Sequence, residues 1–176
     1  MNITAEMIKE LRELTSCGVI ECKKALEEAK GDFDAAQKIL RQRGLELAAK
    51  KGGRTAKEGR IEAYIHQGAK IGVLVEVNCE TDFVAKNDDF CRFTKDIAMH
   101  IAAVSPKYVR GEDVPADVLA KQHDSDTFLK ENCLLEQPFV RDPGKTIRDY
   151  LNELIAKIGE NIFINRFARY KVSEVD

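Results

Sequence analysis

The segment Ile71–Asn87, IGVLVEVNCETDFVAKN, constrains the fold of this chain more than any other stretch. Its first half alternates apolar β-branched residues with other residue types, which predicts a strand with one strongly apolar face. The strand pattern stops at Asn78 and Cys79. A polar stretch carrying one aromatic residue, Phe83, follows just before a helical pattern. The sequence therefore predicts a strand, a polar loop and a helix in immediate succession.

Two roles are open to Phe83 in that loop. It packs back into the core of its own protein, or it stays exposed for a partner molecule. Periodicity favours the core. A single apolar residue in a loop is weak evidence for a partner, because isolated exposed apolar side chains are common and usually have no role. The residues by themselves leave both alternatives open.

The composition limits the class of protein. A chain of 176 residues can hold one medium domain, or a small module plus a core domain. Its net charge of −2 gives no global field that would attract nucleic acid or a membrane. Five cysteines without a C-x-x-C pair indicate free thiols in a reducing compartment, with a disulfide between two chains as the alternative. Their spacing does not match a zinc site, and we expect no metal ion and no cofactor.

The first residues, MNIT, lead directly into a helical pattern, with no apolar signal core or Arg/Ser-rich presequence before it. No apolar run approaches the length that is needed to cross a bilayer. These observations predict a cytoplasmic protein without a membrane partner.

Residues 4–44 have the pattern of three short helices. We expect Thr4 to cap the first, Gly31 to end the second, and Asp32 to cap the third, which Gly44 would end. Three-helix modules of this size resemble the ubiquitin-associated fold.

A module this small has little interior and leaves apolar residues at its surface, and its usual role is binding. The apolar faces predicted for the first two helices include Leu14 and Ile20. Val19 and Ile20, at the start of the second helix, are either core residues or contact residues for a partner.

Residues 45–60 form a basic linker that starts helical and breaks at Gly52 and Gly53. Its five basic side chains, against two acidic ones, could touch RNA phosphates. No interleaved aromatic residues are present to stack on bases, so we expect no nucleic-acid partner.

Residues 61–176 combine strands and helices. The segment 61–66 and the strand that begins at Ile71 predict an antiparallel hairpin with a turn at Gly68. Asn87 is expected to cap a helix that reaches about residue 104. One apolar stripe at helical spacing runs along this helix: Phe90, Phe93, Ile97, Ile101 and Val104.

The stretch 106–144 is less regular. Pro115 is expected to start a short helix. A polar segment at 123–127 separates it from a second helical patch, which spans 128–135.

The C-terminal residues return to clear patterns. Thr146 and Asp149 form a capping-box-like pair at the start of an amphipathic helix that ends at Gly159. Residues 161–172 predict a last strand, and its imperfect alternation requires a bulge.

These patterns together predict an α+β fold. It consists of an N-terminal three-helix module similar to a ubiquitin-associated domain at 1–44, a basic linker at 45–60, and a core domain at 61–176. The core is expected to hold about three antiparallel strands packed with helices. A fold of this kind does not define an activity.

Two motifs resemble the signatures of one family, the bacterial translation elongation factors Ts. CETDFVAKN at residues 79–87 resembles the signature loop, and LRELTSCGVIECKKALEEAKG at 11–31 resembles the N-terminal signature. IAMHIAA at 97–103 and QPFV at 137–140 resemble further segments of the family. The resemblance is to a short form. Long members carry two related core halves and a protruding helical hairpin, and here we expect about one half and a missing or reduced hairpin.

The resemblance implies a guanine nucleotide exchange factor that acts on elongation factor Tu. Such a factor makes and breaks no covalent bond, so the chain is not expected to be an enzyme. Asp82 and Phe83 are implied to enter Tu near its Mg²⁺ site and to promote release of GDP, with Thr81 and Val84 beside them.

The resemblance also implies that the module tip with Val19 and Ile20 contacts the G domain of Tu. The family commonly has two methionines there, and this chain keeps only the apolar character.

A chain with one core half could restore the second by pairing, so we expect a homodimer.

Two other classes compete with the exchange factor. One is a plain binding module, in which residues 1–44 hold a ubiquitin-like protein or a nascent peptide. The other is a hydrolase using His66 and His100, for which the sequence contains no nucleophile motif. We favour the exchange factor, because its two motifs occur in the order typical of the family.

Overall fold

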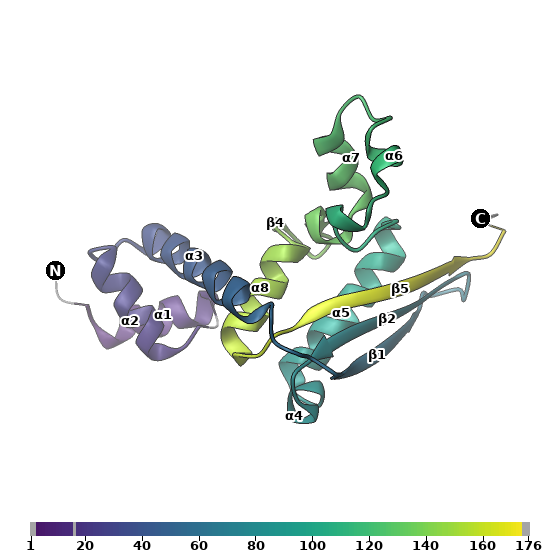
Figure 1. Ribbon diagram of the computed structural model, residues 1–176. Coiled ribbons are helices and arrows are strands. Elements are labelled where there is room, and N and C mark those ends of the chain that lie inside the picture. Colours follow the sequence, from purple (N-terminus) through teal and green to yellow (C-terminus); the bar gives the residue numbers. More distant parts are fainter. Residues whose placement is uncertain (1–2, 16, 174–176) are drawn as a thin grey trace. The chain divides into compact units, whose positions relative to one another are not determined.

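The computed structural model describes residues 3–15 and 17–173, and it separates into two compact units (Figure 1). The first unit comprises residues up to Arg54 together with Asn152–Asn161. The second comprises Thr55–Leu151 and the residues from Ile162 onward. The predicted start at Met1 and Asn2 lies outside the described residues.

The first unit is built from α1 (Ala5–Thr15), α2 (Val19–Glu28) and α3 (Phe33–Lys51), together with the second half of α8 (Ile147–Ile158). The predicted caps are confirmed, because the Ala35 amide donates to Asp32 Oδ1 at 3.0 Å and the Met7 amide donates to Thr4 Oγ1 at 3.3 Å.

The prediction that Gly44 ends the third helix was wrong, since α3 continues to Lys51. Gly44 is buried in this helix, and a Cβ built on it would lie 3.6 Å from Cβ of Ala156 in α8. The glycine therefore lies where α3 packs against α8 and does not mark a helix end. The division at residues 44 and 60 stays a prediction.

The core of α1–α3 is small. It consists of six buried residues: Leu11, Cys22, Ala25, Leu26, Ala36 and Leu40. The predicted inward orientation of Leu14 and Ile20 was wrong, because both side chains are largely exposed. Three short helices enclose too little volume to bury every apolar residue on their faces.

The second unit contains a three-stranded antiparallel sheet in the order β1–β2–β5. β1 (Glu58–Ile65) and β2 (Ile71–Cys79) form the predicted hairpin, and β5 (Phe163–Lys171) pairs with the other edge of β2. The predicted bulge is confirmed. Glu76 pairs with Arg166 and Val77 pairs with Ile164, which leaves Asn165 as the extra residue.

Helix α5 (Asp88–Val104) packs on the sheet and contacts β1 and β2 (Figure 1). Its predicted apolar stripe is confirmed over Phe90, Phe93, Ile97 and Ile101, which are fully buried, whereas Val104 at the last turn is exposed. Between β2 and α5 lies α4 (Asp82–Ala85), a single turn. The polar loop expected at this place is therefore a short helix.

The remaining elements of the second unit are short. They are η1 (Gly111–Asp113), α6 (Ala116–Leu119), α7 (Ser125–Asn132), η2 (Leu134–Glu136), β3 (Pro138–Phe139) and β4 (Asp142–Thr146). The predicted bounds of the second helical patch, 128–135, were wrong, because α7 begins at Ser125 inside the polar stretch and ends at Asn132. The Asp124 carboxylate accepts from the Thr127 amide and caps this helix. β3 and β4 form a second, two-stranded sheet that the sequence did not predict.

The fold class is α+β, as the sequence predicted. None of the described helices has the length and apolar character to cross a membrane.

Candidate functional site

The side chain of Phe83 is 82% exposed and lies on the single turn α4. Thr81 caps this turn, since its hydroxyl oxygen accepts from the Val84 amide at 3.4 Å. The sequence folds this way locally because Thr81 is a good N-cap residue, and Asn87 caps the next helix only a few residues later. Of the two roles open to Phe83, the structure excludes the core.

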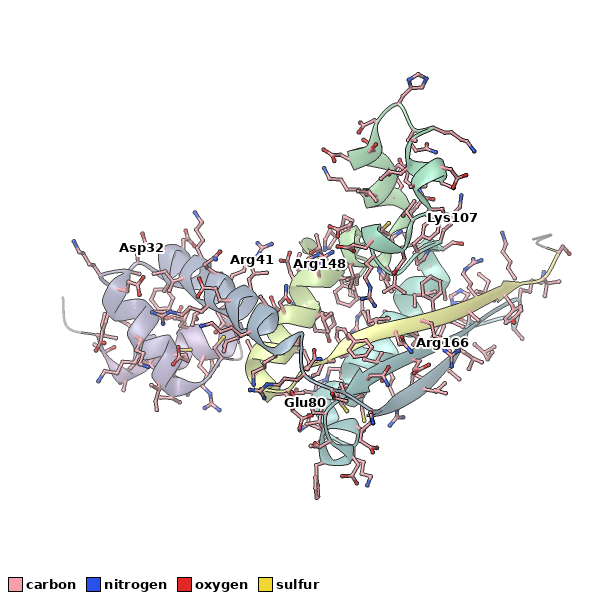
Figure 2. The ribbon with its side chains drawn as sticks, in the orientation of Figure 1. Asp32, Arg41, Glu80, Lys107, Arg148 and Arg166 are labelled. Atoms are coloured by element: carbon pink, nitrogen blue, oxygen red, sulfur yellow. The ribbon has the colours of Figure 1, made fainter. Side chains whose placement is uncertain are left out.

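Sulfur contacts hold α4 from both sides. The Cys79 thiol at the end of β2 donates to the Thr81 carbonyl at 3.1 Å, and the Cys91 thiol in α5 donates to the Ala85 carbonyl at 3.7 Å. Arg60 Nη1 on β1 lies 3.2 Å from Cys91 Sγ. The turn that carries Phe83 is therefore tied to the sheet and to α5, and Glu80, labelled in Figure 2, is the residue where the chain leaves the sheet.

Asp82 and Lys86 form an ion pair one helical turn apart, with Lys86 Nζ 2.8 Å from Asp82 Oδ2. This hydrogen bond, together with the lysine charge, lowers the pKa of Asp82 and raises the pKa of Lys86. Both side chains are exposed. At neutral pH the turn thus presents a carboxylate next to Phe83.

A second apolar surface lies at the start of α2. Val19 and Ile20 are 52% and 68% exposed, and Leu14 at the end of α1 is 62% exposed. Of the two roles open to Val19 and Ile20, the core is excluded. Sequence reasoning placed Leu14 on the apolar face of its helix and missed that its side chain is exposed.

The two histidines of the hydrolase hypothesis have separate partners. His66 is exposed beside the Tyr64 hydroxyl, which lies 3.1 Å from its Nδ1. His100 is fully buried and accepts from the Val140 amide at Nδ1, so its Nε2 carries the proton that bonds Gln137 Oε1 at 3.0 Å. Neither contact pairs a histidine with a serine, threonine or cysteine side chain. Among the residues that the structure describes, no group of three His, Cys, Asp or Glu side chains could hold a metal ion.

The class that these observations define is a protein with exposed apolar side chains at two places, one on a small helical module and one on a capped turn of an α+β unit. The first place is the start of α2 with Val19 and Ile20, and the second is α4 with Phe83.

Comparison with known proteins narrows this class. The family model "Elongation factor TS" matches residues 6–126 and 124–174. Elongation factor Ts of Carboxydothermus hydrogenoformans is 53% identical over an alignment that covers 98% of this chain and 90% of that protein. Elongation factor Ts of Alkaliphilus oremlandii is 55% identical, with coverage of 99% and 91%. The chain belongs to the elongation factor Ts family, whose members are translation elongation factors of protein biosynthesis.

The alignment with the Carboxydothermus protein runs over 195 positions, and this chain has 176 residues. The relative therefore carries residues within the matched length that this chain lacks. The two segments matched by the family model meet at residues 124–126, where α7 begins.

Proposed function

We propose that this chain is a guanine nucleotide exchange factor that binds elongation factor Tu with GDP and promotes release of the GDP. The observation that carries this proposal is the exposed Phe83 on its capped turn, in a chain of the elongation factor Ts family. A rigidly supported aromatic side chain is suited to insertion into a partner, because it brings a large apolar area at low conformational cost.

The proposed mechanism follows from the groups that hold a bound nucleotide in place. A nucleotide held with Mg²⁺ depends on ordered phosphate-binding loops in its protein. Phe83 wedged between elements of Tu would displace such loops, and the Asp82 carboxylate would disturb the polar groups that order the metal. Thr81 and Val84 support the pair, the first by capping the turn and the second by closing it.

The free energy needed to release the nucleotide exceeds what Asp82 and Phe83 can supply. Burying one phenylalanine contributes about 1.5–3 kcal/mol, whereas nanomolar nucleotide affinity corresponds to about 12 kcal/mol. The remaining coupling has to come from a wider contact, for which Val19 and Ile20 on the N-terminal module are exposed.

Coupling between the two ligands of Tu is reciprocal. If this protein weakens GDP binding to Tu, GDP weakens the binding of this protein by the same factor. GTP can then complete the cycle by expelling the factor. No covalent bond changes in these steps, so the protein is not an enzyme, and a factor of this kind acts in the cytoplasm.

We also propose that the chain forms a homodimer. The outer face of the sheet carries apolar residues in register, since Ile65 pairs with Gly72 and Gly72 with Tyr170, while Leu74 lies in the next row between two alanines. Arg166, labelled in Figure 2, forms an ion pair with Glu76 at one end of this face. The exposed large apolar residues of the face are Ile61, Ile65, Leu74, Tyr170 and Val172. A second copy would remove this area from water.

Release of a fluorescent GDP analogue from Tu, with and without this protein, tests the exchange function. We expect a large acceleration that falls about tenfold or more in Phe83→Ala, because one buried phenylalanine is lost. Asp82→Ala should also lower it. Val104→Ala is the matched control, since it truncates an exposed apolar residue of the same unit at a distance in sequence from α4. No acceleration by a folded protein would contradict the proposal.

Light scattering tests the homodimer independently of exchange. We expect twice the chain mass at micromolar concentration, and Leu74→Glu should halve it by placing a charge at the centre of the apolar face. A monomeric mass for the unmodified chain would overturn this part of the proposal.

A further inference from the structure

Two of the five cysteines lie together at the start of α2. Gly18 is the N-cap of this helix, so Cys17 is the residue before the cap and Cys22 is the fourth residue of the helix. These are the two positions at which apolar side chains pack against each other to fix how the chain enters a helix. In this chain, thiols occupy both positions.

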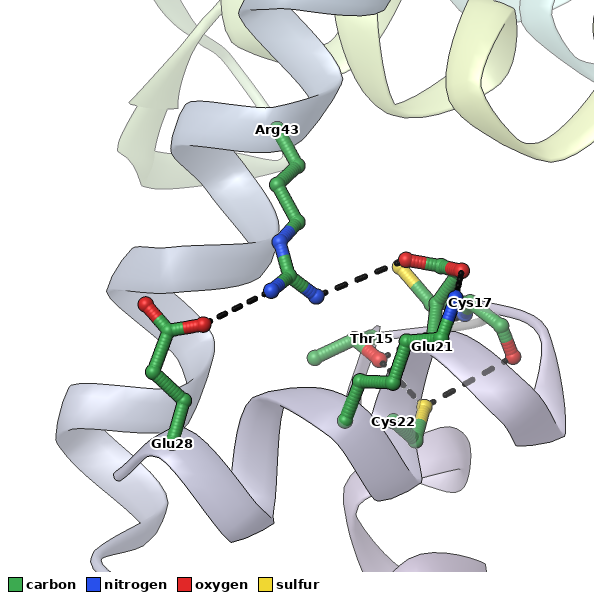
Figure 3. A network of polar contacts seen from close by, with 7 residues as sticks. Thr15, Cys17, Glu21, Cys22, Glu28 and Arg43 are labelled. Atoms are coloured by element: carbon green, nitrogen blue, oxygen red, sulfur yellow. Dashed lines mark hydrogen bonds and ion pairs between the residues drawn. The ribbon is translucent and has the colours of Figure 1, made fainter.

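Contacts around the turn place Cys22 close to Cys17. Cys22 Sγ lies 3.8 Å from the Cys17 carbonyl oxygen and 3.8 Å from Thr15 Oγ1 (Figure 3). Cys22 is fully buried in the core of α1–α3, and Cys17 is half-buried and packs against the same core. The sulfur of Cys22 therefore lies beside the backbone of Cys17, and the Cys17 side chain belongs to the same small core.

We propose that Cys17 and Cys22 are a redox-active pair that closes into a disulfide within the chain when a small disulfide such as oxidised glutathione is in excess. The bond would fix the turn between α1 and α2 and the first turn of α2, where Val19 and Ile20 are exposed. The disulfide itself does not depend on the proposed exchange function, although any effect on a partner of these two residues does.

The chemistry consists of two exchange steps. Cys17 is the accessible thiol of the pair, so it loses its proton to water, and its thiolate attacks one sulfur of oxidised glutathione. The S–S bond of glutathione breaks, one glutathione thiolate leaves and takes a proton, and a mixed disulfide remains on Cys17. Cys22 then loses its proton and attacks the Cys17 sulfur, and the second glutathione leaves as a thiol. The protein has lost two protons and two electrons, and one oxidised glutathione has become two reduced ones.

The surroundings of Cys17 set the rate of the first step. Burial is the main cause that raises the pKa of the Cys17 thiol, and the charges of Cys22, Glu153 and Glu21 add to it, while a hydrogen bond with Thr15 opposes them. Little thiolate is present at neutral pH, so the closure should be slow there and should accelerate as the pH rises.

A mass measurement on the full chain tests this proposal. The protein is equilibrated in glutathione buffers of increasing oxidised fraction, alkylated, and digested with trypsin. Cleavage after Arg12 and Lys23 leaves both cysteines in the single peptide Glu13–Lys23. We expect this peptide to lose two hydrogens and to escape alkylation. Cys17→Ser should abolish that loss, and Cys91→Ser, which removes another half-buried thiol, should retain it.

Three outcomes would overturn the proposal. The peptide could remain fully alkylated in buffers that oxidise a reference dithiol, a glutathione adduct could persist on Cys17 without being displaced by Cys22, or the peptide could oxidise equally well in urea. The last result would mean that closeness in sequence, and not the packing at the start of α2, brings the thiols together. The masses involve no partner protein, so their failure is distinct from a failure of the proposed exchange function.

Discussion

The helical module and the sheet unit differ in how much apolar volume they bury. The core of α1–α3 has six buried residues, half of which are alanine or cysteine. The sheet unit buries the large side chains Phe90, Phe93, Ile97 and Ile101 in one helix alone. Both units nevertheless expose apolar side chains at the start of a helix, Ile20 in α2 and Phe83 in α4.

An exposed apolar side chain is stronger evidence for a contact site in the sheet unit than in the helical module. In the helical module, exposed apolar residues follow from the lack of interior. In the sheet unit a large core lies close by, and Phe90 is fully buried only seven residues after Phe83. Exposure of Phe83 is thus a property of the capped turn that holds it and not a consequence of a full core. Phe83 is accordingly the stronger indicator of a contact site.

The largest expected effect contrasts two phenylalanines of the sheet unit. Phe93→Ala should lower the free energy of unfolding by about 3–5 kcal/mol, because it leaves a cavity beside Tyr150 and the sheet. Phe83→Ala should change it by less than about 0.5 kcal/mol, since its side chain is exposed. Urea denaturation of both variants measures the difference. If both variants were destabilised equally, Phe83 would be a core residue like Phe93 and not a contact residue.

The next effect concerns the small core of the helical module. Leu26→Ala should cost about 2–5 kcal/mol, a large share of the stability that so small a core supplies. Hydrogen exchange should show lost protection in α2 and α3 and retained protection in α5. Leu47→Ala, which truncates an exposed leucine of α3, is the control. A uniform loss of protection in both units would instead mean that they unfold together.

A smaller effect is expected at the cap of α3. Asp32→Ala removes the acceptor of the Ala35 amide and should cost about 1 kcal/mol. Asp34→Ala removes a charge from the same first turn but no capping bond, so its cost should be below about 0.5 kcal/mol. Thermal denaturation followed by circular dichroism compares the two. If both variants lose the same stability, the helix dipole and not the cap explains the role of Asp32.

The smallest effect is a pH dependence in the sheet unit. Burial lowers the pKa of His100, and the hydrogen bond to Gln137 partly opposes this. The folded protein therefore binds fewer protons than the unfolded chain, whose histidine titrates at about pH 6.5. The stability contributed by neutral His100 is fully present above that pH and decreases as the pH falls toward the folded pKa.

Urea denaturation between about pH 5 and pH 7.5 measures this slope. His100→Gln should flatten it, because glutamine does not titrate. The same slope in the protein and in His100→Gln would show that other groups cause it.

Much of the fold could be predicted because its signals are local. Asp32, Asn87 and Thr146 cap helices through their own side chains, so three or four residues of sequence are enough to place them. The bulge in β5 was predictable from a break in alternation. The strand pair β3–β4 was not, because two residues in one strand leave no periodicity to detect.

The position of the candidate site in the sequence was predictable, but the exposure and contacts of its side chains were not. Its motif located Asp82 and Phe83 after β2, and the sequence left open whether Phe83 was buried. The ion pair with Lys86, the sulfur contacts of Cys79 and Cys91, and the exposure of Leu14 came only from the structure. The local contacts require residues 82–85 to fold as a helical turn, and the exposure of Leu14 depends on which surfaces the other helices cover.

The sequence by itself determined the α+β class, most helix starts, the strand order along the chain and the family. These rest on spacing and side-chain type within one or two turns, or on motifs that can be compared directly. The tertiary structure decided that α3 continues through Gly44, that His100 is buried with Gln137, and that Phe83 points to solvent. Burial is set by residues far apart in the sequence, and only the folded chain brings them together.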